Sequence, residues 1–308
     1  MPIVLRHILF IATVLMFTLA GKTPAALITY EGFNYSAGPI DAQTGGTGWD
    51  TAGWDTQSDN TGYAVNSSSP VTFGTLETSG NYLNGGGSFT NTGRRVLANF
   101  GSSWDSAGRV SSPFSDQNLD QGVVWASMLI RVNAPITSWD NARVWFHDQN
   151  VPWSPGGSAD NNGLQIRSNG GANWGITEGQ NGGITTTGVA ASVGTTYLLV
   201  AKFELSLTAG ANNAYVWMFD NPASVTLGGA DLATGTAMAS ITGRDTADLR
   251  FKSIGFYLDN ANDRLSVDEI RLGTTFADVT PTAIPEPSTY AFLIGGLGAL
   301  AWLRRLRK

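Results

Sequence analysis

The sequence predicts an all-β fold of two antiparallel sheets, and three observations carry this prediction. The chain of 308 residues contains 38 Gly without a three-residue period, so the excess of Gly indicates many turns and excludes collagen. Hydrophobic residues make up 42% of the chain, which is enough for a core and argues against disorder. Apolar and polar residues alternate with a period of two along several segments, whereas no segment of the body keeps a helical period over more than two turns.

Residues 1–26 have the three parts of a signal peptide. Arg6 and His7 form a basic start, an apolar run of 13 residues follows at 8–20, and small residues end the segment at Ala25 and Ala26. The apolar run is too short to span a bilayer as a helix. We therefore expect export and a cut after Ala25 or Ala26, with a buried N-terminal helix as the alternative. The exported chain has no Cys, so its stability rests on core area, with or without bound cations.

Residues 282–308 carry a second processing pattern. The triplet Pro285, Glu286 and Pro287 precedes an apolar run at residues 290–303, and four basic residues close the chain: Arg304, Arg305, Arg307 and Lys308. A helix over the apolar run covers about 21 Å, short of a hydrocarbon core of about 30 Å, so we expect a marginal transmembrane helix. The positive end of such a helix stays on the cytoplasmic side.

This tail resembles the PEP-CTERM sorting signal of bacterial exported proteins, in which a Pro-Glu-Pro triplet, a short transmembrane stretch and an Arg-rich end follow in order. The resemblance implies a membrane-anchored precursor that an exosortase recognises and cleaves. It also implies a final place at the cell surface or in the extracellular matrix of bacteria that make exopolysaccharide. An ordinary C-terminal membrane anchor is the alternative.

The exported body is acidic, which limits its partners. Without the two terminal segments, 12 Lys and Arg face 23 Asp and Glu, a formal charge of −11. Binding to nucleic acid or to an anionic membrane surface rests on cationic side chains that neutralise phosphates, so we expect no nucleic-acid partner. Neutral glycans, cations and basic proteins remain open.

The body is predicted to form one domain at residues 27–281. Long strands are expected at residues 123–132, 196–205, 214–219, 249–258 and 265–272, within a total of about 12 to 14 strands. In the second of these, Lys202 and Glu204 point away from the face that carries Phe203. Turn clusters of Gly and Asn separate the strands, and no linker composition interrupts the body. A span of this length is ordinary for an exported jelly roll.

Parts of the body resemble the concanavalin A-like (laminin G-like) jelly rolls. The segment 266–272, with the acidic pair Asp268 and Glu269 followed by Arg271, resembles the closing strand of such domains, which lies next to the first strand, here residues 27–33. Residues 30–33 and 46–49 resemble the start of such domains in other exported PEP-CTERM proteins. The resemblance implies a two-sheet antiparallel sandwich and no particular activity.

A carboxylate pair for glycoside hydrolysis is not expected. Jelly-roll β-glucanases carry Glu-x-Asp-x-x-Glu on one strand, because nucleophile and acid lie about 5 to 5.5 Å apart in retaining enzymes. None of the Glu residues of the body has that spacing. Asp268 and Glu269 are neighbours on a strand and are expected to point to opposite faces. We expect Asp268 to make a structural hydrogen bond or an ion pair with Arg264 or Arg271.

His147 is the only imidazole of the exported body. It could serve as the general base of a polysaccharide lyase, with Tyr and Arg neighbours as acid and charge neutraliser. Jelly-roll lyases use a set of Gln, His, Tyr and Arg, but their strand motifs are missing here, and no Gly-x-Ser-x-Gly elbow supports a Ser-His-Asp triad. A hydrogen-bonded His at a strand end is therefore favoured, and no catalytic residue is assigned.

The loop at residues 259–263 is the candidate metal site. Asp259, Asn260, Asn262 and Asp263 offer oxygen ligands of the kind that Ca²⁺ takes. The same residue types are the default of hairpin turns, so an empty turn is favoured and a Ca²⁺ site is the alternative. Zinc and iron are not expected, because the body has one His and no Cys.

Three tryptophans are candidates for a sugar-binding platform. Trp139, Trp153 and Trp174 lie in or beside segments rich in Gly, Pro and Asn, where a loop could present their flat faces to sugar rings. Burial in the core is the commoner fate of Trp and is favoured, and the platform is the alternative. Together, the sequence predicts an exported, sorted, non-catalytic envelope or matrix protein that binds carbohydrate such as exopolysaccharide. A polysaccharide lyase or glycosidase built on His147 and a purely structural matrix component are the alternatives.

Overall fold

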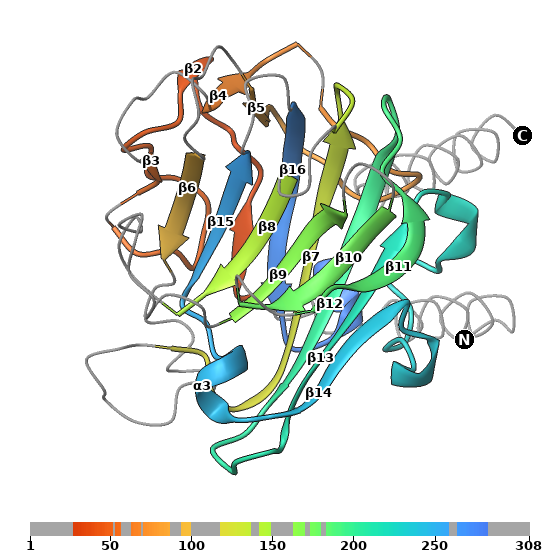
Figure 1. Cartoon of the computed structure of the whole chain (residues 1–308). Coiled ribbons are helices and arrows are strands. Elements are labelled where there is room, and N and C mark those ends of the chain that lie inside the picture. Colours follow the sequence, from red (N-terminus) through yellow and green to blue (C-terminus); the bar gives the residue numbers. More distant parts are fainter. Residues whose placement is uncertain are drawn as a thin grey trace, which may run out of the picture.

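A computed structural model describes residues 27–51, 53–56, 63–68, 70–86, 94–99, 118–136, 142–148, 163–169, 173–179, 183–258 and 264–282. These residues form two antiparallel sheets that pack face to face, which confirms the predicted jelly-roll sandwich (Figure 1). The predicted signal peptide and the sorting tail from residue 283 on lie outside the described residues. Within the ranges given, no helix is both long and apolar enough to cross a membrane.

The larger sheet has nine strands. Their order across the sheet is β14 (Ala239–Arg244), β13 (Asn212–Phe219), β12 (Thr196–Leu205), β7 (Gly122–Val132), β16 (Leu265–Gly273), β5 (Tyr82–Gly85), β4 (Tyr63–Asn66) and β2 (Gly38–Pro39). The ninth strand, β1 (Thr29–Glu31), pairs with β16, and Thr29 lies opposite Leu272. The predicted contact between the first and the closing strand is therefore confirmed.

The smaller sheet has seven strands, and Figure 1 shows most of its outer face. Their order is β11 (Thr185–Ala190), β10 (Asn173–Glu178), β9 (Gly163–Asn169), β8 (Ala142–His147), β15 (Ser253–Leu258), β6 (Arg94–Asn99) and β3 (Asp55–Thr56). The chain changes sheet at β3, β4, β6, β7, β8, β12, β15 and β16. As a result the last two strands lie inside the sheets: β16 lies between β7 and β5, and β15 lies between β8 and β6.

The main core lies between the two sheets and follows the predicted alternation. On β12, Tyr197, Leu199 and Phe203 face this core, whereas Lys202 and Glu204 lie on the other face. The expected strand at 249–258 is shorter than predicted, because the one-turn helix α3 (Thr246–Leu249) precedes β15. Two 3-10 turns, η1 (Pro222–Ser224) and η2 (Thr234–Thr236), and the one-turn helix α4 (Phe276–Val279) complete the described helices.

A second apolar cluster covers the outer face of the nine-stranded sheet. Trp125, Leu198 and Trp217 of β7, β12 and β13 point into it. It is covered by α4 and by residues 70–80, which we call the strap, through these side chains: Val71, Phe73, Leu76, Phe276 and Val279. Burial of apolar side chains on both faces explains why β7 reads as an almost continuous apolar run.

A β-bulge in β16 places three charged residues under the strap. The register with β7 shifts between Asp268 and Arg271, and Glu269 has a φ of 55°, in the left-handed region. Because the bulge inserts one residue, Asp268, Glu269 and Arg271 all contact the strap, whereas Val267 and Ile270 stay in the main core. The expectation that Asp268 and Glu269 point to opposite faces is therefore wrong.

Candidate functional site

His147 lies on the outer face of the seven-stranded sheet. Along β8 the side chains of Val144 and Phe146 point into the main core, so Arg143, Trp145 and His147 point away from it. Gly163 lies opposite His147 at the start of β9, with a φ of 104°, and a Cβ there would lie 2.0 Å from the Phe146 carbonyl oxygen. Only Gly therefore allows β9 to pair at this point.

The neighbouring strands extend this outer face with further polar side chains. On β9, Leu164 and Ile166 face the core, and Gln165 and Arg167 lie on the outside. Residues Trp145 and Gln165 are directly opposite in register, as are Arg143 and Arg167. On the other side of β8, Tyr257 of β15 lies opposite Arg143 and Ser253 lies opposite His147. We call Arg143, Trp145, His147, Gln165, Arg167 and Tyr257 the outer polar layer.

The side chains of the outer polar layer contact one another. Arg143 donates to Gln165 Oε1 at 3.4 Å, and its guanidinium carbon lies 4.9 Å from the centre of the Tyr257 ring. The rings of Trp145 and His147 meet edge to face at a centroid distance of 4.4 Å. In the described part of the chain, the buried Gln165 Nε2 has no hydrogen-bond partner. A buried amide donor without a partner costs free energy.

Burial makes this layer unusual. The exposed fraction is 5% for Arg143, 7% for Arg167, 1% for His147 and 0% for Gln165. Arginine is almost never fully buried unless its charge is compensated, and like charges directly opposite each other across strands destabilise a sheet. The outer face of the nine-stranded sheet, by contrast, is covered through apolar contacts. The outer faces of the two sheets therefore differ in chemistry. Because the side chains of the outer polar layer are buried, a ligand can contact them only if this face is uncovered.

The Asp268 and Glu269 cluster is structural and not a second candidate site. Asp268 accepts hydrogen bonds from the N–H groups of Val71 at 3.1 Å and Glu269 at 2.9 Å, which confirms the expected structural hydrogen bond. The ion pair of Arg271 is with Glu269. Burial, and then the charge of Glu269, raise the pKa of Asp268 to about 8. The strap covers both carboxyl groups, and their exposed fraction is 0%.

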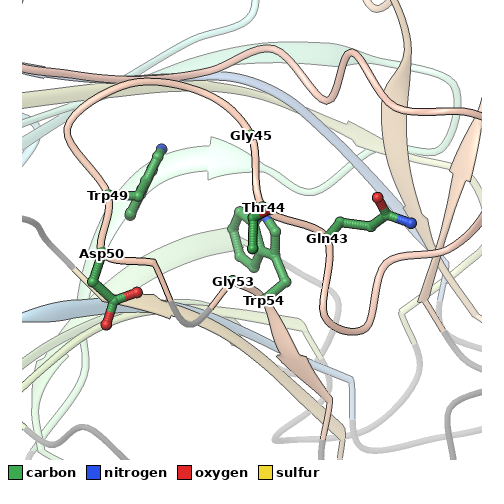
Figure 2. A pocket seen from close by; sticks show the side chains of 7 residues that line it. All are labelled: Gln43, Thr44, Gly45, Trp49, Asp50, Gly53 and Trp54. Carbon is green, nitrogen blue, oxygen red and sulfur yellow. The ribbon is translucent and has the colours of Figure 1, made fainter.

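A small hollow of about 190 Å³, counting space open to solvent, lies in the loop between β2 and β3. Figure 2 shows Trp49 and Asp50 on one side of it and Gln43 on the other, with Trp54 between them. The two indole rings are 5.8 Å apart at their centres. Both indole N–H groups already donate to the protein: Trp49 to the Tyr30 carbonyl and Trp54 to the buried carboxylate of Glu31. Neither N–H group is therefore free to bind a ligand in the hollow.

The predicted platform of Trp139, Trp153 and Trp174 is wrong for Trp174. This residue is fully buried in the main core, with its ring edge-on to Tyr197 at a centroid distance of 5.8 Å. Trp139 and Trp153 lie outside the described residues. The sequence contained a signal for the burial of Trp174, since Ile176 follows at the same face of an alternating strand.

The other predicted site residues also fall outside the described residues. This holds for the Ca²⁺ candidates Asp259, Asn260, Asn262 and Asp263, for the triplet at residues 285–287 and for the basic residues at 304–308. In the described ranges, no group of three or more His, Asp or Glu side chains is arranged to hold a metal ion.

Comparison with known families identifies the C-terminal segment. A family model described as the PEP-CTERM protein-sorting motif matches residues 283–308. The chain carries a PEP-CTERM sorting motif. The match begins directly after Thr282, the last described residue, and includes the predicted triplet, apolar run and basic end. The motif indicates an exported protein with a C-terminal membrane anchor that an exosortase processes. A search of curated protein sequences found no match.

The body that precedes the PEP-CTERM motif is similar to several solved structures. The exoplasmic/lumenal domain of VIP36, in a Ca²⁺/Man3GlcNAc-bound form, is 13% identical with a TM-score of 0.39, covering 72% of this chain and 85% of that one. The globular domain of T. cruzi calreticulin is 10% identical with a TM-score of 0.42, covering 81% and 88%. The cellulose induced protein Cip1 is 10% identical with a TM-score of 0.44, covering 78% and 98%. From likenesses at this level we draw nothing about ligand or activity.

Proposed function

We propose that this chain is a non-catalytic protein of the cell envelope or extracellular matrix that an exosortase sorts and that binds an anionic polysaccharide. The observation that supports the binding is the pair Arg143 and Arg167, directly opposite each other on β8 and β9 and both buried. Two guanidinium groups in this register present planar N–H donors on one face, and a carboxylate or sulfate would accept paired hydrogen bonds from them.

The rest of the outer polar layer fits the same ligand class. Trp145 lies beside both arginine-bearing positions but is buried, so its ring would receive a sugar only once this face is uncovered. Gln165 Nε2, a buried donor with no partner among the described residues, would donate to a sugar hydroxyl or carboxylate once this face is uncovered. The formal charge of −11 on the whole exported body, this layer included, disfavours general attraction to polyanions. Binding would therefore depend on this one cationic face.

The experiment is binding of the purified protein to immobilised alginate and polygalacturonate, with dextran and xylan as neutral probes. We expect binding to the two anionic polymers, and its loss in Arg143→Gln and Arg167→Gln. The matched control is Arg131→Gln, which removes an exposed arginine of the nine-stranded sheet. Binding that survives both layer substitutions in folded protein contradicts the site. Absence of binding to every polymer would favour a purely structural matrix component.

A polysaccharide lyase is the second candidate, because His147 lies on the same sheet face as Arg143, Gln165 and Tyr257. One distance weighs against it. Tyr257 lies opposite Arg143, four residues before His147 on β8, and this offset separates the backbones of His147 and Tyr257 by about 13 Å. A general base and a general acid that act on one sugar unit must each lie within about 3 Å of the substrate atom with which they exchange a proton. We therefore favour binding over catalysis.

An assay for unsaturated products separates these two functions. We expect no unsaturated or reducing ends from alginate or polygalacturonate. Turnover by the unmodified protein that disappears in a folded His147→Ala variant would overturn the non-catalytic proposal.

We favour an ordinary turn at residues 259–263. A Ca²⁺ site formed by Asp259, Asn260, Asn262 and Asp263 is the alternative proposal. A Ca²⁺ ion that binds only the folded loop would stabilise the domain by about 2.7 kcal/mol at a hundredfold excess over Kd. Chelation by EDTA would then lower the melting temperature by several degrees, and the effect would vanish in Asp259→Asn with Asp263→Asn. An unchanged melting curve identifies the loop as a turn.

A further inference from the structure

The folded domain continues up to the residue before the sorting motif. Leu76 of the strap and Thr282 form an antiparallel bridge, and the Glu77 N–H donates to the Pro281 carbonyl at 2.9 Å. We call this pairing the clasp. The matched motif begins at the next residue, 283. The clasp therefore leaves no linker between the sandwich and the segment that the exosortase processes.

The chain that leads into the clasp is firmly held. The Phe276 N–H of α4 donates to Asp231 at 2.7 Å, and Ser127 of β7 donates to the Val279 carbonyl at 2.5 Å. Thr275 and Asp278 form a capping box at the start of α4. Phe276 and Val279 are fully buried in the second apolar cluster. This end of the domain is thus part of the fold and not a frayed terminus.

The other half of the clasp is held by the bulge of β16. Asp268 accepts from the Val71 N–H, Glu269 accepts from the Ser79 N–H at 2.5 Å, and Arg271 donates to the Glu77 carbonyl at 2.5 Å. Three buried side chains of one strand therefore fix the strap on both sides of Leu76. Both partners of the clasp are anchored independently, so opening it means separating Pro281 and Thr282 from the strap.

The sequence distance from the clasp to the triplet is short. Pro285 follows Thr282 by three residues, which span at most about 11 Å when extended. A protease binds several substrate residues in an extended and accessible conformation, and cleavage next to folded structure follows the population of the locally opened form. We propose that the clasp has to open before the exosortase cuts, so that the closed clasp slows maturation of the precursor. This inference rests on the proposed processing by an exosortase.

A reversible crosslink tests the proposal on the full-length precursor in membranes of its native host. The clasp residues form a pair that is not directly hydrogen-bonded, whose Cα atoms lie about 4.5 Å apart, within the range that a disulfide requires. The chain has no Cys, so Leu76→Cys with Thr282→Cys can form only this one intramolecular bond. We expect release to be at least about tenfold slower in oxidised than in reduced membranes. A disulfide typically stabilises the closed form by about 2 to 4 kcal/mol, and a tenfold change requires about 1.4 kcal/mol.

A second variant avoids any change in the apolar cluster. Six Gly and Ser residues inserted between Thr282 and Ala283 supply free chain before the triplet while the clasp stays closed. We expect release at least about threefold faster than from the unmodified precursor. The matched control places the same insert between Ala209 and Gly210, in the exposed turn between β12 and β13, where release should not change.

Two results would overturn the proposal: equal release from the oxidised and reduced crosslinked precursor, or no effect of the linker after Thr282. Failure of the sorting function itself looks different. In that case the unmodified precursor, in which the clasp is intact, is not released at all, and neither variant changes this.

Discussion

Glu269 and Arg271 form a fully buried ion pair across a bulge in β16, although they are two residues apart on one strand. A regular strand would also place them on one face, but the bulge lets Asp268 join them there. The guanidinium of Arg271 also lies 5.2 Å from the centre of the Tyr30 ring, so β1 shares in the cluster.

Glu269→Gln should lower the free energy of unfolding by about 3 to 5 kcal/mol, because it leaves a buried arginine without its counter-ion. Denaturant unfolding followed by tryptophan fluorescence measures the loss. The control is Arg244→Gln, which breaks the pair of Arg244 with Glu178; Arg244 is 47% exposed, so the change should stay below about 1 kcal/mol. Equal losses in the two variants would contradict a special contribution from the buried pair.

The stability of the protein should fall as pH rises from about 4 to 8, and Asp268 should contribute to the fall. The pKa of Asp268 is raised to about 8 by burial and by Glu269, so the folded state holds a proton that the unfolded state has lost above pH of about 4. This contribution is complete below the unfolded pKa and is lost as pH rises through the folded pKa.

The comparison of unmodified protein with Asp268→Asn isolates this residue, because burial raises the pKa of Glu269 and of Glu31 in the same direction. Asn resembles the protonated acid, so the urea midpoint of the variant should change less between pH 5 and pH 8. Parallel pH profiles for the two proteins would show that Asp268 titrates normally.

Trp174→Ala should destabilise the domain by about 3 to 5 kcal/mol through a cavity in the main core. The same variant, under conditions where it is folded, should bind polysaccharide as the unmodified protein does. Thermal unfolding and a binding assay on the same sample measure both. A selective loss of binding with unchanged stability would restore Trp174 to the ligand platform.

Replacement of Pro285, Glu286 and Pro287 by alanine should leave the precursor uncleaved and held in the membrane of its native host. Cell fractionation and the mass of the product measure this. Ser288→Ala with Thr289→Ala is the neighbouring control. Normal release of the triplet variant would contradict processing at the sorting motif.

Sequence periodicity was sufficient to predict the long strands, but the expected total of 12 to 14 is smaller than the sixteen strands that the described residues form. The alternation on β12 placed Phe203 inward and Lys202 outward, and the structure agrees. Alternation also separates Arg143, Trp145 and His147 from the core residues between them. Alternation does not predict the register between β8 and β9, which places Arg143 opposite Arg167. That register depends on pairing between strands, and one sequence does not specify it.

The bulge could not be predicted for a different reason. A left-handed backbone conformation is expected at Gly or Asn, whereas here Glu269 adopts it. Three contacts of its side chain, with Ser79, Tyr30 and Arg271, hold it there. Ser79 and Tyr30 are distant from Glu269 in sequence, so the left-handed conformation of Glu269 is a product of tertiary structure.

The strand order has a consequence for the way this protein reaches its folded state during export. β16 joins β7 to β5, and β15 joins β8 to β6, so the N-terminal and middle parts of each sheet stay separate until the last two strands arrive. Thr29 pairs with Leu272, a contact between opposite ends of the body. Such long-range contacts form slowly because the whole intervening chain has to be ordered. A chain that crosses the membrane from its N-terminus therefore exposes unpaired strand edges until translocation is nearly complete, and such edges can pair with other chains.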